Sequence, residues 1–140
     1  MPHTFKSTGT FRYSPKRLGE LAPSPNWWLV IDCDSAIGDY YRHLYHVRHY
    51  KCRSLQRPAW KEHISVVRNE CPPEDRKCLW DLYEGQSVEF SYSTGIKCGG
   101  PFCWIDVECD LALDIREELG LSRQPHYELH LTIGNDSHKP

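Results

Sequence analysis

Two short stretches of the chain combine a histidine with a hydroxyl residue two positions later. They read His63-Ile64-Ser65-Val66 and His130-Leu131-Thr132-Ile133. Because side chains alternate between the two faces of an extended strand, each histidine shares a face with the hydroxyl of its own motif. A histidine can accept or release a proton near neutral pH, and a hydroxyl can donate a hydrogen bond to a phosphate oxygen. We therefore predict an acid, a base and two donors, a set that suits the cleavage of a phosphodiester without a metal.

The predicted chemistry needs a phosphodiester with a neighbouring hydroxyl group. One histidine would remove the proton of that hydroxyl, and the other would protonate the leaving oxygen. Ser65 and Thr132 would hold the non-bridging oxygens as negative charge builds on them. The sequence does not distinguish the acid from the base, so both assignments of His63 and His130 stay open.

The segments that precede the two motifs resemble each other. Residues 28–34 read Trp-Leu-Val-Ile-Asp-Cys-Asp and residues 104–110 read Trp-Ile-Asp-Val-Glu-Cys-Asp. The Trp, the Cys and the last Asp are identical, and the branched apolar residues between them are typical of strands. Each segment ends at an aspartate, Asp34 or Asp110, that is expected to cap a following helix.

Apolar spacing predicts those helices from residue 35 to about residue 51 and from residue 111 to 119, where Gly120 ends the second. The order strand, helix, histidine strand thus occurs twice, in pseudo-repeats of about 27–68 and 103–134. A pseudo-twofold axis between the repeats would bring the two histidines to face each other.

The region between the repeats has weaker signals. We predict a short helix over 74–83, a strand over 87–93 in which alternate residues are apolar, and a flexible glycine-rich loop over 95–101. A chain of 140 residues without a linker is expected to form one domain over 1–140.

Composition limits the classes of partner. The formal net charge of −2 argues against a protein that coats long nucleic acids, which needs an excess of Lys and Arg. Basic residues do gather within 12–17 and 42–57, where a solvated surface is expected. No apolar run approaches the roughly 20 residues that cross a membrane. The first nine residues lack an apolar signal core, so we expect a cytoplasmic location and free thiols for the seven cysteines. The oligomeric state is not indicated.

The paired motifs resemble those of the two-histidine (2H) phosphoesterase superfamily, which is defined by two His-x-Ser/Thr-apolar motifs on a bilobal fold. Longer stretches are similar to phage anti-CBASS cyclic-oligonucleotide phosphodiesterases, namely residues 9–15, 27–28, 40–42, 58–70 and 129–134. The likeness runs from about residue 8 to residue 135. It implies an α+β fold in which two antiparallel sheets, related by a pseudo-twofold axis and flanked by helices, enclose a central cleft.

The resemblance also implies a function. Such enzymes cleave the 3′–5′ cyclic di- and trinucleotide second messengers of CBASS, a bacterial antiphage defence, in the host cytoplasm and with no cofactor. Carried onto this chain, the catalytic residues are His63 and His130, and the phosphate contacts are Ser65 and Thr132. Tyr13 is implied to lie against a base, and Lys16 to contact a phosphate.

An RNA-processing enzyme is an alternative function. A phosphodiesterase that opens 2′,3′-cyclic phosphates or cleaves 2′–5′ linkages would use the same two histidines. The pocket would decide between these readings, because a cyclic dinucleotide needs stacking surfaces for two bases. Candidate stacking residues are Tyr13, Trp60, Trp80 and Trp104.

A non-catalytic zinc-binding or nucleotide-binding module is a further alternative. His43, His46 and His49 recur every third residue of the first predicted helix and are followed by Cys52. The remaining ligands of a zinc site could be Cys98, Cys103 and Cys109. However, no Cys-x-x-Cys pair is present, and steps of three residues drift by about 60° around a helix, which favours a solvated helix face.

Overall fold

The computed structural model describes residues 4–15, 26–50, 54–57 and 62–135 of the chain. Six strands occur within these ranges: β1 (Thr4–Tyr13), β2 (Leu29–Asp32), β3 (His63–Val67), β4 (Ser87–Gly99), β5 (Phe102–Glu108) and β6 (His130–Asn135). The same ranges contain two α-helices and one 3₁₀ helix: α1 (Ser35–Arg48), α2 (Asp110–Glu118) and η1 (Glu74–Leu79). The predicted order strand, helix, histidine strand is therefore present twice, as β2–α1–β3 and β5–α2–β6.

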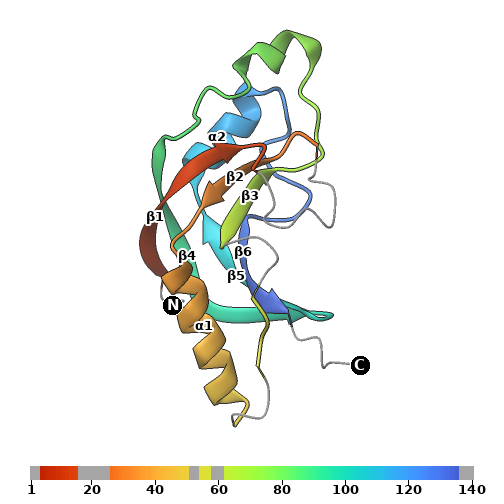
Figure 1. Cartoon of the computed structure of the whole chain (residues 1–140). Coiled ribbons are helices and arrows are strands. Elements are labelled where there is room, and N and C mark those ends of the chain that lie inside the picture. The colour runs from red at the N-terminus through yellow and green to blue at the C-terminus, as the bar shows by residue number, and fades with distance from the viewer. Residues whose placement is uncertain (1–3, 16–25, 51–53, 58–61, 136–140) are drawn as a thin grey trace.

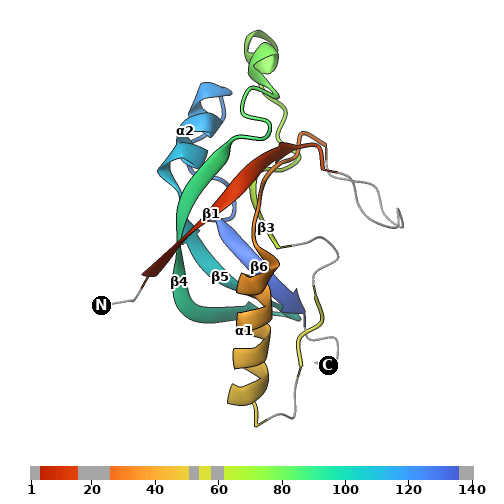
Figure 2. The ribbon, with the colours of Figure 1, turned by 60° about the vertical axis from the view of Figure 1, so that its left-hand side comes forward.

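The strands form a closed barrel in the order β1-β2-β3-β6-β5-β4, and every neighbouring pair is antiparallel. The predicted bilobal α+β fold with two separate sheets and a cleft between them is therefore wrong. β1 is the physical reason, because it pairs with β4 over residues 4–10 and with β2 over residues 10–13. β1 and β4 thus join the strands of the two repeats on the side opposite β3 and β6, which closes the barrel (Figures 1 and 2).

The barrel interior holds the apolar core. Phe11, Ile31, Ile64, Ile105 and Leu131 are all 0% exposed and come from five different strands. Each fully buried side chain of this kind stabilises the fold by about 1.5–3 kcal/mol relative to an exposed one. Since side chains alternate along a strand, burial of one set directs the intervening polar residues to the outer surface of the barrel.

α1 begins where the sequence predicts it, and α2 begins one residue before its predicted start. The Asp34 carboxylate accepts a hydrogen bond from the Ala36 amide at 2.9 Å and so caps α1. α2 differs from the prediction by one residue, because Cys109 is its N-cap and Asp110 is its first residue. Gly120 follows α2 with φ +76°, the left-handed conformation that glycine adopts most easily at a helix end.

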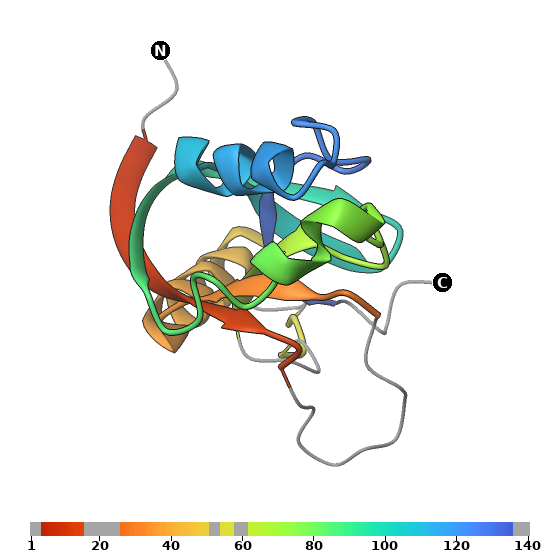
Figure 3. The ribbon, with the colours of Figure 1, turned by 90° about the horizontal axis from the view of Figure 1, so that it is seen from above.

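The helices occupy different ends of the barrel. α1 projects from the lower end in Figures 1 and 2, whereas α2 and η1 lie at the upper end. Seen from above, α2 and η1 lie side by side over that upper end (Figure 3). Neither α-helix of the described residues is long and apolar enough to cross a membrane.

The region between the repeats is more ordered than predicted. The strand predicted over 87–93 continues to Gly99 as β4, so the flexible loop predicted over 95–101 is wrong, and only Gly100 and Pro101 form the turn to β5. The reason is the partner strand: Ile96 pairs with Ile105 and Cys98 with Cys103. Cys98 and Cys103 form a disulfide, which corrects the expectation of free thiols for these two residues. In the helix predicted over 74–83, η1 occupies the first part.

Candidate active site

The two histidine motifs have the alternation predicted from the sequence. In β3, Ile64 and Val66 are buried while His63 and Ser65 are half-exposed. In β6, Leu131 and Ile133 are buried while His130 and Thr132 are half-exposed. The apolar residues of each motif thus anchor its strand in the core, and both polar pairs lie on the outer face of the barrel.

β3 and β6 are neighbours in the barrel, with Ile64 opposite Leu131. In an antiparallel pair this register sets His63 opposite Thr132 and Ser65 opposite His130. The two histidines are then diagonal neighbours, a relation that separates positions on adjacent strands by about 7–8 Å. Imidazole rings at that spacing can contact opposite sides of one phosphate group.

A cavity of about 880 Å³ lies over this outer face and is lined by His63, His130 and Thr132. Ser65 is not among its lining residues. The structure therefore brings three of the four predicted motif residues to one cavity, and the fourth stands beside it on the same face of β3.

His130 has a defined tautomer. Its Nδ1 lies 2.8 Å from the carbonyl oxygen of Glu128, and because a carbonyl can only accept, Nδ1 carries the hydrogen of the neutral ring. Nε2 then has the lone pair, and the ring can accept a proton at that atom. Trp104 lies beside His130 with ring centroids 6.2 Å apart and also lines the cavity.

Trp28 links the two polar residues of β3. Its indole ring lies edge-on to His63 with centroids 5.4 Å apart, and its Nε1–H donates to the Ser65 hydroxyl oxygen at 3.0 Å. Trp28 is 1% exposed and is therefore held by packing. The Ser65 hydroxyl accepts this bond and keeps its own hydrogen as a donor.

The cavity also contains charged and aromatic side chains that the sequence argument did not select. Arg68, Lys97 and a third histidine, His126, are the basic ones, and Asp106 and Glu128 are the acidic ones. Lys97 Nζ lies 2.5 Å from Asp106 Oδ2, and this hydrogen bond raises the pKa of Lys97 above its usual value. The ammonium is therefore held in the charged state at the edge of the cavity.

Phe102 and Tyr127 add exposed aromatic surface to the cavity wall. Their exposed fractions are 54% and 74%. Alternation could have found part of this wall, since Phe102, Trp104 and Asp106 share one face of β5 and Cys103, Ile105 and Val107 the other. Alternation assigns Tyr127 to the apolar face with Leu129 and Leu131, which is wrong, because Tyr127 precedes β6 in an irregular segment and is exposed.

Tyr13 lies in the core and is not among the lining residues of this cavity. Its ring is edge-on to Trp80 at 4.9 Å, its hydroxyl oxygen accepts from the Tyr83 amide at 3.3 Å, and burial raises its pKa to about 12. Trp80 lines a different cavity, with Trp27 and Asn69. Lys16 and Trp60 lie outside the described residues. Of the predicted stacking residues, Trp104 alone is placed in the histidine cavity by the described part of the chain.

Several residues of the alternative zinc site have other partners. His46 Nδ1 lies 3.1 Å from the Ser54 hydroxyl, His49 Nδ1 lies 2.8 Å from the Tyr45 carbonyl oxygen, and the sulfurs of Cys98 and Cys103 are bonded to each other. Cys52 is outside the described residues. Among residues 4–15, 26–50, 54–57 and 62–135, no group of three or more His, Cys, Asp or Glu residues is arranged to hold a metal ion.

Comparisons of the chain with protein-family models, with curated proteins and with solved structures found no significant match.

Proposed function

We propose that the chain is a metal-independent phosphodiesterase that cleaves 3′–5′ cyclic di- and trinucleotide second messengers, with His63 and His130 as its acid–base pair. The observation that carries the proposal is the convergence of two histidines and the Thr132 hydroxyl on one cavity. On this proposal the enzyme acts in the cytoplasm of a bacterial host and lowers the messenger level that activates CBASS.

The proposed reaction begins with the 2′-hydroxyl beside the scissile 3′–5′ linkage. His130 Nε2 takes the hydroxyl proton, because its other ring nitrogen already donates to Glu128. The 2′ oxygen attacks phosphorus, the bond from phosphorus to the 5′ oxygen breaks, and His63 gives its proton to the departing oxygen. The product is a 2′,3′-cyclic phosphate, which water can open with the two histidines in exchanged roles.

Positive and hydroxyl groups around the histidines support a phosphate ligand. Thr132 can donate to a non-bridging oxygen, and Arg68 brings a cationic group to the same cavity, where Lys97 is paired with Asp106. Donors that are already oriented in the folded protein stabilise the charge that grows on those oxygens in the transition state.

The size and walls of the cavity support a substrate with bases. Its volume of about 880 Å³ lies within the range of about 300–1,000 Å³ that is usual for ligand pockets. Trp104, Phe102 and Tyr127 offer aromatic surface, and stacking of a base on such a side chain contributes about 1–3 kcal/mol.

A substrate panel tests the proposal. Purified protein is incubated in excess EDTA with 3′–5′ cyclic di- and trinucleotides, a 2′–5′ oligoadenylate and a 2′,3′-cyclic mononucleotide. We expect cleavage of the cyclic oligonucleotides and a fall of about 100- to 10,000-fold in kcat for His130→Ala. His43→Ala is the matched control, because His43 is exposed on α1 and does not line the cavity.

The other outcomes have defined meanings. Cleavage of only the 2′–5′ oligoadenylate and the 2′,3′-cyclic mononucleotide would assign the chain to RNA processing. Binding of the messengers without any cleavage by folded protein would contradict catalysis and favour a nucleotide-binding module.

A further inference from the structure

Two arginines are buried in the part of the chain that the structure describes. Arg42 on α1 is 9% exposed, and Arg116 on α2 is 0% exposed. Removing a guanidinium from water is unfavourable unless nearly all of its donors find partners. Apolar residues in the place of a buried ion pair are often equally stable, so stability alone does not account for two such sites.

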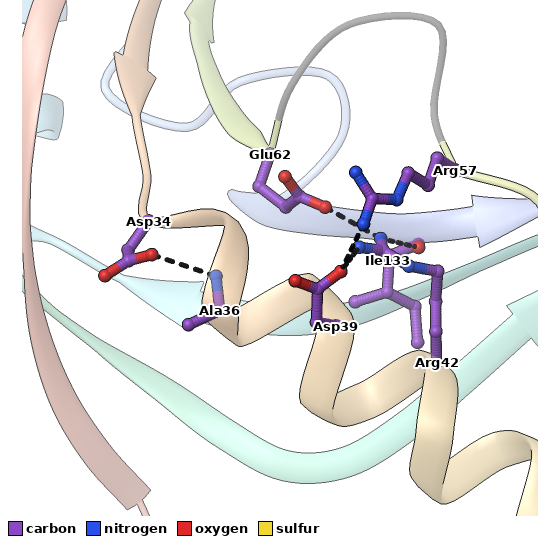
Figure 4. A network of polar contacts seen from close by, with 7 residues as sticks. All are labelled: Asp34, Ala36, Asp39, Arg42, Arg57, Glu62 and Ile133. Atoms are coloured by element: carbon purple, nitrogen blue, oxygen red, sulfur yellow. Dashed lines mark hydrogen bonds and ion pairs between the residues drawn. The ribbon is translucent and has the colours of Figure 1, made fainter.

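Arg42 connects α1 to both histidine strands (Figure 4). Its Nη1 donates to the Ile133 carbonyl oxygen at 2.8 Å and lies 2.7 Å from Glu62 Oε1. Its Nη2 donates to Asp39 at 2.6 Å. Ile133 belongs to β6, and Glu62 is the residue before His63. Gly38 makes room for this arrangement, since a Cβ at that position would collide with the Glu62 carboxylate and the Arg42 guanidinium.

Arg116 makes the corresponding connection from α2. Its Nη1 donates to the Val66 carbonyl oxygen of β3 at 2.9 Å. The same guanidinium forms a two-pronged pair with Glu70, with N–O distances of 2.7 and 2.8 Å, and its Nε donates to the Ser122 carbonyl oxygen at 2.8 Å. All of the side chain's hydrogen-bonding nitrogens are thus engaged.

The two contacts are equivalent in the repeat. Val66 and Ile133 are the fourth residues of the two histidine motifs, and each carbonyl accepts from the helix of the opposite repeat. β3 and β6 pair where Ile64 lies opposite Leu131. Val66 lies two residues beyond Ile64 on β3, and Ile133 lies two residues beyond Leu131 on β6. Because the strands are antiparallel, these two residues lie on opposite sides of the Ile64–Leu131 pair. The arginines therefore bind β3 and β6 at both ends of the short stretch that carries the histidines.

We propose that Arg42 and Arg116 are positioning residues, which fix the relative placement of His63 and His130 by holding β3 and β6 through their backbone carbonyls. The inference rests on the proposed function, and it extends that function to residues that do not line the cavity. A displacement of about 1 Å between reacting groups can cost about 100-fold in rate.

Three variants test the proposal. Arg42→Lys and Arg116→Lys keep the charge, but an ammonium cannot reproduce the planar fork that reaches a carbonyl and a carboxylate together. Gly38→Ala displaces the Arg42–Glu62 pair without changing either charged residue. Arg76→Lys is the matched control, because Arg76 also donates to a backbone carbonyl, that of Glu118 at 2.8 Å, but lies away from both histidine strands.

Each variant is first shown to be folded by its melting temperature, and then kcat, KM and the ¹⁵N ring signals of the two histidines are measured. In all three variants we expect kcat to fall about 100-fold, KM to change little and the histidine signals to shift. In Arg76→Lys we expect both kcat and the histidine signals to stay as in the wild type. Folded variants with wild-type kcat and unshifted histidine signals would overturn the proposal. If the wild-type protein cleaves no substrate, the proposed function fails, while a shift or its absence in the histidine signals still decides the positioning role.

Discussion

At the scale of single residues, the two histidines have different surroundings. His130 donates through Nδ1 to the Glu128 carbonyl, which orients the ring and leaves Nε2 to receive a proton. His63 stands edge-on to the buried Trp28 ring, which fixes its position by packing. On the proposed function, these differences favour His130 as the base and His63 as the acid, a choice that the sequence alone left open.

A sulfur-substituted substrate tests this assignment. When the 5′ leaving oxygen is replaced by sulfur, the departing group is a thiolate. It needs no proton to leave, because a thiol, with a pKa of about 8.5, is far more acidic than an alcohol. We expect His63→Ala to cleave this substrate at close to the wild-type rate while remaining slow on the oxygen substrate. His130→Ala should stay slow on both. The reverse pattern, with rescue of His130→Ala, would exchange the two roles.

The exposed aromatic residues of the cavity give a second prediction. If Phe102 and Tyr127 stack on bases, replacing either with alanine should raise KM about 5- to 150-fold, which corresponds to about 1–3 kcal/mol of lost stacking. Steady-state kinetics on a cyclic dinucleotide measures the change. Phe5→Ala is the control, because Phe5 is also 54% exposed but lies on β1. An equal effect of Phe5→Ala, or none at either cavity position, would argue against stacking.

Alternation along the motifs was enough to predict which of their residues face outward. The apolar residues of the motifs, such as Ile64 and Leu131, are expected to be buried in the core. The histidines, which alternate with them along the strand, must therefore face outward. The environment of Tyr13 was not predictable, because its burial depends on Trp80 and Tyr83, which are far from it in sequence. Tyr13 therefore stabilises the core and does not line the histidine cavity.

At the scale of elements, α2 is attached to the segment after β3 by the Arg116–Glu70 pair. The hydrogen bond from Arg116 is the main cause that lowers the pKa of Glu70 below its usual value of 4.5. A carboxyl whose folded pKa is depressed contributes stability above its unfolded pKa, and this contribution is lost as the pH falls through the folded value.

The pH dependence of Glu70→Gln follows from this sign. At pH 7 the variant should have a lower urea midpoint of unfolding than the wild type. The difference between the two midpoints should narrow as the pH falls below 4.5. Glu74→Gln is the control, since Glu74 forms an exposed surface pair with Lys77 and such pairs contribute little. If the difference between the urea midpoints is the same at pH 7 and at acid pH, Glu70 does not stabilise the fold through its charge.

The helices were predictable from local signals, and the hairpin was not. The start of α1 is marked by Asp34 and by the apolar spacing that follows it, and both signals come from residues that are close in sequence. β4 continues past Ser93 only because Ile96 and Lys97 find partners in β5. From sequence alone, Gly95, Gly99 and Gly100 favour a loop. The Cys98–Cys103 bond could not be predicted, because it depends on the register that places these two residues opposite each other.

At the scale of the whole molecule, the closed barrel explains how one outer face can carry both motifs. β3 and β6 are adjacent because the barrel order places them so, whereas the bilobal fold expected from the resemblance would have separated two sheets by a cleft. Closure depends on β1, whose Gly9 allows the chain to pass close to β2, since a Cβ there would meet Ile31 and the Asp32 carbonyl. Contacts between residues so far apart in sequence cannot be read from composition or periodicity.

On the proposed function, two histidines on one outer face of the closed barrel cut a phosphodiester through its own 2′-hydroxyl. The most direct measurement is a ³¹P NMR time course of a 3′–5′ cyclic dinucleotide with the protein in excess EDTA, beside its 2′-deoxy analogue. We predict that a 2′,3′-cyclic phosphate signal appears before any phosphomonoester, that the 2′-deoxy analogue stays intact, and that His63→Ala and His130→Ala suppress the signal. Cleavage of the 2′-deoxy analogue at the wild-type rate, or full activity in either histidine variant, would contradict this account.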